Sequence, residues 1–188
     1  MSLLVAGLVL FLGVHLIPVV APWRAALAAR LGERGYRAAF SLVALAGLIA
    51  IVAGYARAGP EPAFTTARPW AAALSPVVMA VALTLLAASK LSGYIRRTVR
   101  HPMLAGTILW AGLHLAANGE ARSVVLFGAF LAWALVDLVS ACARGTARPF
   151  EPRLLHDAIA VGLGVPATIV LAWAHGPLFG AAIGPFAR

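Results

Sequence analysis

Hydrophobic residues form six long runs along this chain, and short stretches rich in charge and proline separate them. Each run is close to the roughly 17 to 25 residues that an α-helix needs to cross a bilayer. The runs are continuous rather than alternating, and helices satisfy their own backbone groups in lipid. The pattern therefore predicts transmembrane helices at residues 3–21, 37–56, 70–89, 102–117, 123–143 and 155–174.

The composition supports this prediction. The chain is 62% hydrophobic and only 11% charged, with a mean hydropathy of +0.93, whereas a soluble domain has roughly a quarter of its residues charged. All predicted connections are short, so residues 1–188 are expected to form a single transmembrane domain, an all-α six-helix bundle. The first run lacks a basic leader and a convincing cleavage site, which favours a helix over a signal peptide.

The distribution of charge predicts the orientation. The net charge is +9, and eleven of the fifteen basic residues fall in the first, third and fifth connections. By the positive-inside rule these connections face the cytoplasm, which places both termini on the periplasmic side of a bacterial inner membrane. Because the basic residues are spread over loops, membrane lipid is expected as a partner and nucleic acid is not. The eleven residues are Arg24, Arg30, Arg34, Arg37, Lys90, Arg96, Arg97, Arg100, Arg144, Arg148 and Arg153.

Two histidines inside the predicted helices are the main candidates for chemistry. Imidazole is poorly solvated by hydrocarbon, so His15 and His114 need a partner, a metal or a proton to handle. Helical spacing places each in a stripe with small or aromatic residues, where a flat aromatic ligand fits. The stripes are Gly7, Phe11, His15 and Pro18 on the first helix, and Thr107, Ala111, His114 and Asn118 on the fourth.

The two histidines differ in predicted depth by about 9 Å when residues are counted from the basic ends of their helices. Axial ligation requires only that both side chains point at one iron, so a tilted macrocycle between His15 and His114 is compatible with this offset. The alternative for each ring is a hydrogen bond between helices. The lone Cys142 excludes an intramolecular disulfide and a Cys-rich metal site.

A basic group precedes the fourth helix. Arg97, Arg100 and His101 are expected to form an anion site, because guanidinium groups suit carboxylates and phosphates in a partly dry setting. Haem propionates or lipid headgroups fit such a site, and the alternative is a solvated interfacial histidine in a basic loop.

Two acidic residues also lie in or at predicted helices. Asp137 is expected either to orient the ring of His15 or to pair with a loop arginine, because an unpaired carboxylate in the membrane costs roughly 2.5 to 3.5 kcal/mol. The adjacent His156 and Asp157 point about 100° apart on a helix, which predicts two separate contacts rather than a dyad.

Three motifs together carry a family resemblance: Phe11-x-x-x-His15-x-x-Pro18, Arg100-His101-Pro102-x-x-x-Gly106-x-x-x-Trp110-x-x-x-His114-x-x-x-Asn118-Gly119, and Phe127-Gly128-x-Phe130. They resemble the NnrU family of bacterial membrane proteins over essentially the whole chain. The resemblance implies a role in denitrification or nitric oxide metabolism. It also implies a relation to 15-cis-ζ-carotene isomerase, a membrane enzyme with haem b whose histidine ligands match His15 and His114. Position 111 is alanine, so no cysteine near His114 offers a thiolate ligand.

The sequence is compatible with several functions. A haem protein of this type is expected to act in redox chemistry or as a cis-trans isomerase, with a redox partner or a hydrophobic, carotenoid-like substrate. The element Arg100-His101-Pro102-x-x-x-Gly106 also resembles membrane methyltransferases that use S-adenosylmethionine, although Leu104 replaces their tyrosine and their paired glutamates are missing. A third possibility is a non-catalytic assembly factor for a denitrification complex.

Overall fold

The computed structural model describes residues 1–63, 68–145 and 149–179. Within these ranges the regular structure is helical, apart from an isolated β-bridge between Pro62 and Glu120. Proline stands in the first turn of α3 and α5, where its missing N–H leaves no helical bond unmade. The elements are α1 (Ser2–Leu16), the 3₁₀-helix η1 (Ile17–Val19), α2 (Ala21–Arg57), α3 (Pro69–Ala88), α4 (Tyr94–Val99), α5 (Pro102–Ala117), α6 (Ala121–Arg144) and α7 (Leu154–Phe179).

Five of the described helices are long and apolar enough to cross a membrane, namely α1 extended through η1, α2, α3, α6 and α7. The chain is therefore a multi-pass membrane protein. The 16-residue α5 is a shorter apolar helix, so the predicted number of six spans is not confirmed. The placement of both termini on the periplasmic side stays a prediction, and Arg148 lies outside the described residues.

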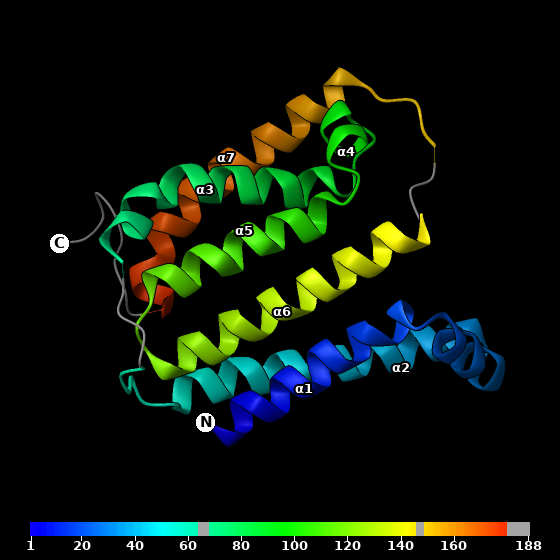
Figure 1. Cartoon of the computed structure of the whole chain (residues 1–188), viewed down its shortest axis with the longest axis horizontal. Coiled ribbons are helices and arrows are strands. Elements are labelled where there is room, and N and C mark those ends of the chain that lie inside the picture. The colour runs from blue at the N-terminus through cyan, green and yellow to red at the C-terminus, as the bar shows by residue number, and fades with distance from the viewer. Residues whose placement is uncertain (64–67, 146–148, 180–188) are drawn as a thin grey trace.

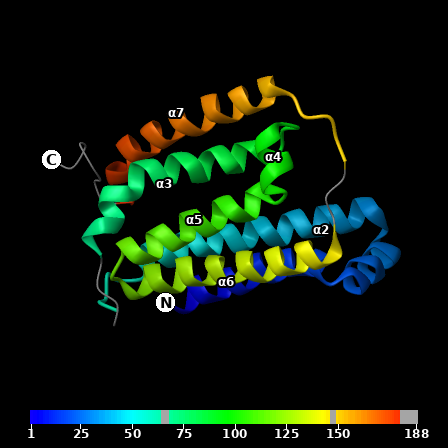
Figure 2. The same cartoon turned by 45° about the horizontal axis from the view of Figure 1, so that its top comes forward.

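The helices form two groups joined by one shared helix (Figures 1 and 2). Helices α1 and α2 pack along each other as a pair, while α3 packs against both α5 and α7. Helix α6 contacts α5 on one side and α1 on the other. Two elements that carry the candidate histidines, α1 and α5, are thus placed on either side of α6.

Glycines permit the close approach of α1 and α2. A Cβ added at Gly7 would lie 2.6 Å from the backbone nitrogen of Ile51, and one added at Gly47 would lie 2.7 Å from that of Phe11. At Gly54 an added Cβ would collide with the backbone of Leu4. Small residues at such positions let helix backbones meet in lipid, where the hydrophobic effect gives no drive for association.

The first connection differs from the prediction. Residues 22–36, which the sequence predicts as a loop, belong to α2, because this helix begins at Ala21 and continues through a bend at Gly32, whose φ of 70° suits glycine. The predicted helix 3–21 is also too long, since α1 ends at Leu16 and a 3₁₀ turn containing Pro18 follows. We call the part of α2 before Gly32 the basic arm (residues 21–31).

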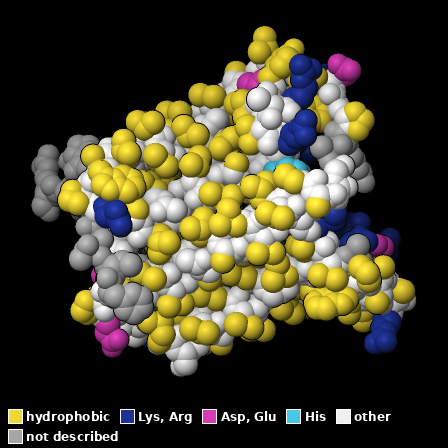
Figure 3. Space-filling view, viewed as in Figure 1, with side chains coloured by type: hydrophobic (Ala, Val, Ile, Leu, Met, Phe, Trp, Pro, Cys, Tyr) yellow, Lys and Arg dark blue, Asp and Glu magenta, His cyan; other side chains and the backbone are white. Residues whose placement is uncertain are grey.

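Basic side chains gather at one end of the molecule, as the charge pattern predicts. Figure 3 shows Lys and Arg side chains concentrated where α4, the end of α6 and the bend of α2 lie. Hydrophobic side chains cover the flank of the bundle between its two ends. We refer to this end as the basic end.

Candidate functional site

His15 lies in the last turn of α1, surrounded by aromatic side chains from three helices. Its ring centroid is 4.4 Å from that of Phe11, 5.0 Å from that of Phe40 and 5.9 Å from that of Trp133. Its Nδ1 donates a 2.6 Å hydrogen bond to the carbonyl oxygen of Phe11, one turn earlier. The ring is therefore half-buried in an aromatic setting and its orientation is fixed by its own helix.

His114 lies in the last turn of α5 and repeats this arrangement. Its Nδ1 donates a 2.8 Å hydrogen bond to the carbonyl oxygen of Trp110. Its ring is 4.6 Å from that of Phe127 and 5.6 Å from that of Trp110, measured between centroids. The ring of His175 on α7 also stacks near His114, with centroids 6.4 Å apart.

The hydrogen bond that each histidine makes to its own helix determines which of its ring nitrogens can bind a ligand. A carbonyl oxygen can only accept, so Nδ1 of both His15 and His114 carries the proton. The lone pair of each neutral ring is then on Nε2. Metal-binding histidines in proteins commonly donate their other ring N–H to a backbone carbonyl in this way, which fixes the tautomer and the ring orientation.

A continuous series of rings connects the two histidines. Phe130 of α6 lies between Phe11 and Trp110, with ring centroids 5.8 and 5.4 Å away. His15 therefore reaches His114 through Phe11, Phe130 and Trp110, and we call these rings together with Phe40, Phe127 and Trp133 the aromatic cluster.

The histidines themselves are offset along α6. His15 contacts Trp133 and His114 contacts Phe127, six residues apart, which corresponds to about 9 Å along a helix axis. This agrees with the offset that the sequence predicts. The structure thus connects His15 and His114 through aromatic side chains and does not place their rings in direct contact.

Two buried hydrogen-bond donors in or next to the aromatic cluster have no acceptor in the described part of the chain. They are the hydroxyl of Tyr36 and the indole Nε1 of Trp133. The Tyr36 side chain is 8% exposed and packs against Phe40, which contacts His15. Leaving such a group unpaired in an apolar interior costs roughly 1–3 kcal/mol. A ligand that brings acceptor atoms to this region would remove that cost.

Asp137 does not orient His15. Its carboxylate pairs with Arg144, one of the predicted loop arginines, at 3.4 Å, while the Nδ1 of His15 is already bonded to the backbone of Phe11. Of the two expected roles, the ion pair is the one found.

The three residues of the expected anion site lie together at the basic end. Arg97 stacks over the ring of Tyr94 at 5.3 Å, and Arg100 and His101 form the bend between α4 and α5. Because α5 is continuous, His101 and His114 are thirteen residues, or about 20 Å, apart along it. The structure therefore does not bring this site close to His114.

The bend between α4 and α5 is strained. Arg100 has φ 61° and ψ −47°, an unusual conformation for a residue other than glycine, and His101 N–H donates to the carbonyl oxygen of Val99 at 2.7 Å. Such strain is found most often at functional sites and must be maintained by the surrounding contacts.

The start of α7 holds the beginning of α4 in place. Asp157 accepts hydrogen bonds from the backbone N–H groups of Tyr94 and Ile95, at 2.8 and 2.9 Å, and so caps α4. His156 accepts separately from the N–H of Ser92 at 3.1 Å. The prediction of two distinct contacts for this pair is confirmed.

Replacing Asp157 by alanine is expected to destabilise α4 by about 0.5–2 kcal/mol, because two backbone donors lose a charged acceptor. Hydrogen exchange of the amides of Tyr94 and Ile95 should become several-fold faster in the detergent-solubilised chain. Glu151→Ala, which removes an exposed carboxylate near the same end, is the matched control. Unchanged exchange in the Asp157 variant would show that the cap does not stabilise α4.

A sequence model described as NnrU protein matches residues 3–183, nearly the whole chain. The chain belongs to the NnrU family. No curated protein and no solved structure matches it. The family predicted from the sequence motifs is thus confirmed, while the relation of this NnrU chain to ζ-carotene isomerase stays a prediction.

Sequence reasoning missed part of this NnrU site. The rings of Phe127, Phe130 and Trp133 recur every three residues on α6, a helical stripe of which the family motif covers only Phe127 and Phe130. The sequence pattern predicts a loop at Tyr36 and ends the last helix just before His175. Both positions depend on helices that continue past prolines or a glycine bend, which local patterns do not reveal.

Proposed function

We propose that this NnrU protein binds haem b in the bacterial inner membrane, with Nε2 of His15 and Nε2 of His114 as the iron ligands. The observation that carries the proposal is the matching hydrogen bond of the two histidines, which directs a lone pair of each ring away from its own helix. Helices on either side of α6 supply the two histidines, and binding of one iron by both requires the rings of Phe11, Phe130 and Trp110, which lie between them, to move aside.

The surroundings of the histidines fit a macrocycle better than a bare metal ion. In the described ranges no three His, Cys, Asp or Glu side chains come together as a metal site, so a free ion would lack ligands. The aromatic cluster offers flat apolar faces, and the unpaired donors of Tyr36 and Trp133 suit acceptor groups such as carboxylates. The residues present therefore fit haem in their chemistry.

Haem, when bound, would supply one-electron redox chemistry to this site. The contribution of the chain is to orient two imidazoles through the carbonyls of Phe11 and Trp110, and to exclude water with the aromatic cluster. Two imidazole ligands favour electron transfer or redox sensing. We propose such a redox role, in keeping with the denitrification and nitric oxide metabolism that the family resemblance implies. Cis-trans isomerisation of a carotenoid-like substrate is the second role that this resemblance supports.

Arg97, Arg100 and His101 are proposed as an anion site separate from the iron ligands. Their distance along α5 from His114 favours a lipid phosphate over a carboxylate of a haem on that histidine. Guanidinium groups beside a strained bend at the basic end suit such a headgroup.

The absorption spectrum of the purified full chain, before and after addition of haem, tests the proposal. We expect a Soret band and the sharp visible bands of a low-spin, bis-imidazole haem. Binding of S-adenosylmethionine by a chain that binds no haem would support a methyltransferase instead. A chain that binds neither would favour an assembly role.

Tyr36→Phe and Trp133→Phe test whether the unpaired donors serve the ligand. Each change removes one donor, so the affinity for haem is expected to fall about five- to tenfold, in line with roughly 1 kcal/mol per hydrogen bond. Ligand-free Tyr36→Phe should be at least as stable as the parent, because only an unsatisfied hydroxyl is removed, whereas Trp133→Phe also loses packing against the core. Trp70→Phe, at an exposed position, is the control. Unaltered haem affinity would show that these donors do not face the ligand.

A further inference from the structure

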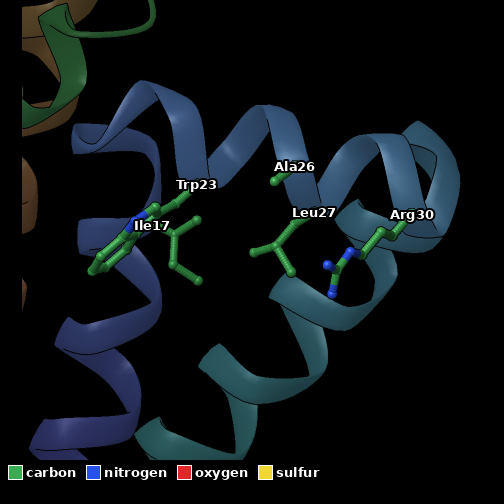
Figure 4. A pocket seen from close by; sticks show the side chains of 5 residues that line it. All are labelled: Ile17, Trp23, Ala26, Leu27 and Arg30. Atoms are coloured by element: carbon green, nitrogen blue, oxygen red, sulfur yellow. The ribbon is translucent and has the colours of Figure 1, made fainter.

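A hollow of about 460 Å³ lies at the basic end, between η1 and the basic arm of α2. Figure 4 shows the side chains around it: apolar groups of Ile17 and Leu27, the indole of Trp23, and the guanidinium of Arg30 directed back toward Leu27. Ala26 completes the lining. The site is separate from the aromatic cluster that the proposed function uses.

The hollow combines an apolar surface with one cation that has no counterion. Among the described residues Arg30 makes no ion pair, whereas Arg24 and Arg37 of the same region both pair with Glu33, at 3.0 and 3.8 Å. In the described part of the chain Glu33, the acidic residue just beyond the basic arm, is therefore already paired, and Asp137 near η1 is paired with Arg144. A ligand that suits this hollow carries an apolar part and a negative charge.

We propose that this hollow binds an anionic phospholipid, with an acyl chain along Ile17, Trp23 and Leu27 and the headgroup phosphate at Arg30. The location supports a lipid, because the hollow lies where the apolar helices end and basic residues gather, the level of the headgroups. A half-exposed tryptophan is typical of this level of a membrane protein. Arginine binds a phosphate through two parallel hydrogen bonds. An anionic headgroup is preferred over a zwitterionic one because it brings no cation of its own close to the guanidinium.

The basic arm explains why the site is formed. Residues 23, 26, 27 and 30 recur at helical spacing and face the hollow together, while the bend at Gly32 turns the arm back from the main axis of α2. The arm thus presents an apolar face that ends in Arg30, while Arg24 lies off that face, and amphipathic helices of this kind lie in the plane of the membrane surface. The lipid would thus fill the angle between this arm and the end of α1.

Quenching of Trp23 by brominated acyl chains tests the proposal on the full-length chain. The protein is placed in vesicles of brominated phosphatidylcholine, and the signal of Trp23 is taken as the difference from Trp23→Phe. Unbrominated phosphatidylglycerol should relieve the quenching about fivefold more effectively than unbrominated phosphatidylcholine, as expected for one arginine near the surface. Arg30→Gln should abolish most of this preference.

Arg34→Gln is the matched control, since it removes the same charge from the same region outside the hollow. It should keep most of the preference for phosphatidylglycerol. Equal loss in the two variants, or no preference in the parent, would overturn the proposal in favour of general attraction to the surface. Loss of the preference on addition of inorganic phosphate would show that Arg30 binds a free anion rather than a lipid. Ala26→Phe, which fills the hollow, should reduce quenching by either lipid.

Discussion

Replacing His114 by alanine is expected to remove haem binding almost completely. The substitution deletes the proposed Nε2 ligand and leaves the Trp110 carbonyl without its partner. The affinity should therefore fall by more than the roughly 10- to 100-fold that loss of an orienting group costs. The measurement is a haem titration followed in the Soret band. His15→Ala should either act in the same way or leave a five-coordinate, high-spin haem on His114, visible by resonance Raman spectroscopy.

His156→Ala is the control for removing a histidine, because His156 contacts the backbone of Ser92 at the basic end and lies outside the aromatic cluster. It should bind haem with an unchanged spectrum. His175→Ala tests whether His175, rather than His15, is the second ligand beside His114. The ring of His175 stacks near that of His114 and could take this place. An unaltered spectrum in His15→Ala together with a high-spin spectrum in His175→Ala would contradict His15 as the second ligand.

Gly54→Val is the substitution that should most strongly destabilise the fold. Its side chain would collide with the backbone of Leu4, a residue that is 0% exposed in the core between α1 and α2. Backbone cannot rotate away as a side chain can, so we expect a loss of about 3 kcal/mol or more. Thermal unfolding of the solubilised chain, followed by size-exclusion chromatography, measures the effect.

Gly13→Val is the matched control on α1, because a Cβ at this position meets no atom within 4 Å. It should leave the melting temperature nearly unchanged. A similar loss in both variants would mean that glycine flexibility, rather than close approach of the helices, is what the chain needs.

The sequence predicts the spanning helices well because long apolar runs have a single physical explanation in lipid. Each predicted run falls mainly within a described helix, and the gathering of arginines at one end follows from the same pattern. The ends of helices are predicted less well. The basic arm and α4 are helical although they carry charge, since an amphipathic helix at a membrane surface and a loop have similar composition.

The candidate site was predicted only in part, because the rest of it depends on tertiary contacts between helices. Spacing along one helix identifies a stripe around His15 or His114, but it does not show that α6 supplies Phe130 between them. The capping of α4 by Asp157 likewise joins positions about sixty residues apart. Such contacts depend on which helices become neighbours, and one sequence does not determine that choice by pattern alone.

The position of α6 has a mechanical consequence. The pair α1–α2 and the group α3–α5–α7 each pack extensively within themselves, whereas α6 provides the main described contact from one to the other. A haem bound by one imidazole from the pair α1–α2 and one from the group α3–α5–α7 would form a second connection between these two groups of helices. Haem binding should make the two groups unfold in a single thermal transition. Without haem they should be able to rotate relative to each other about α6.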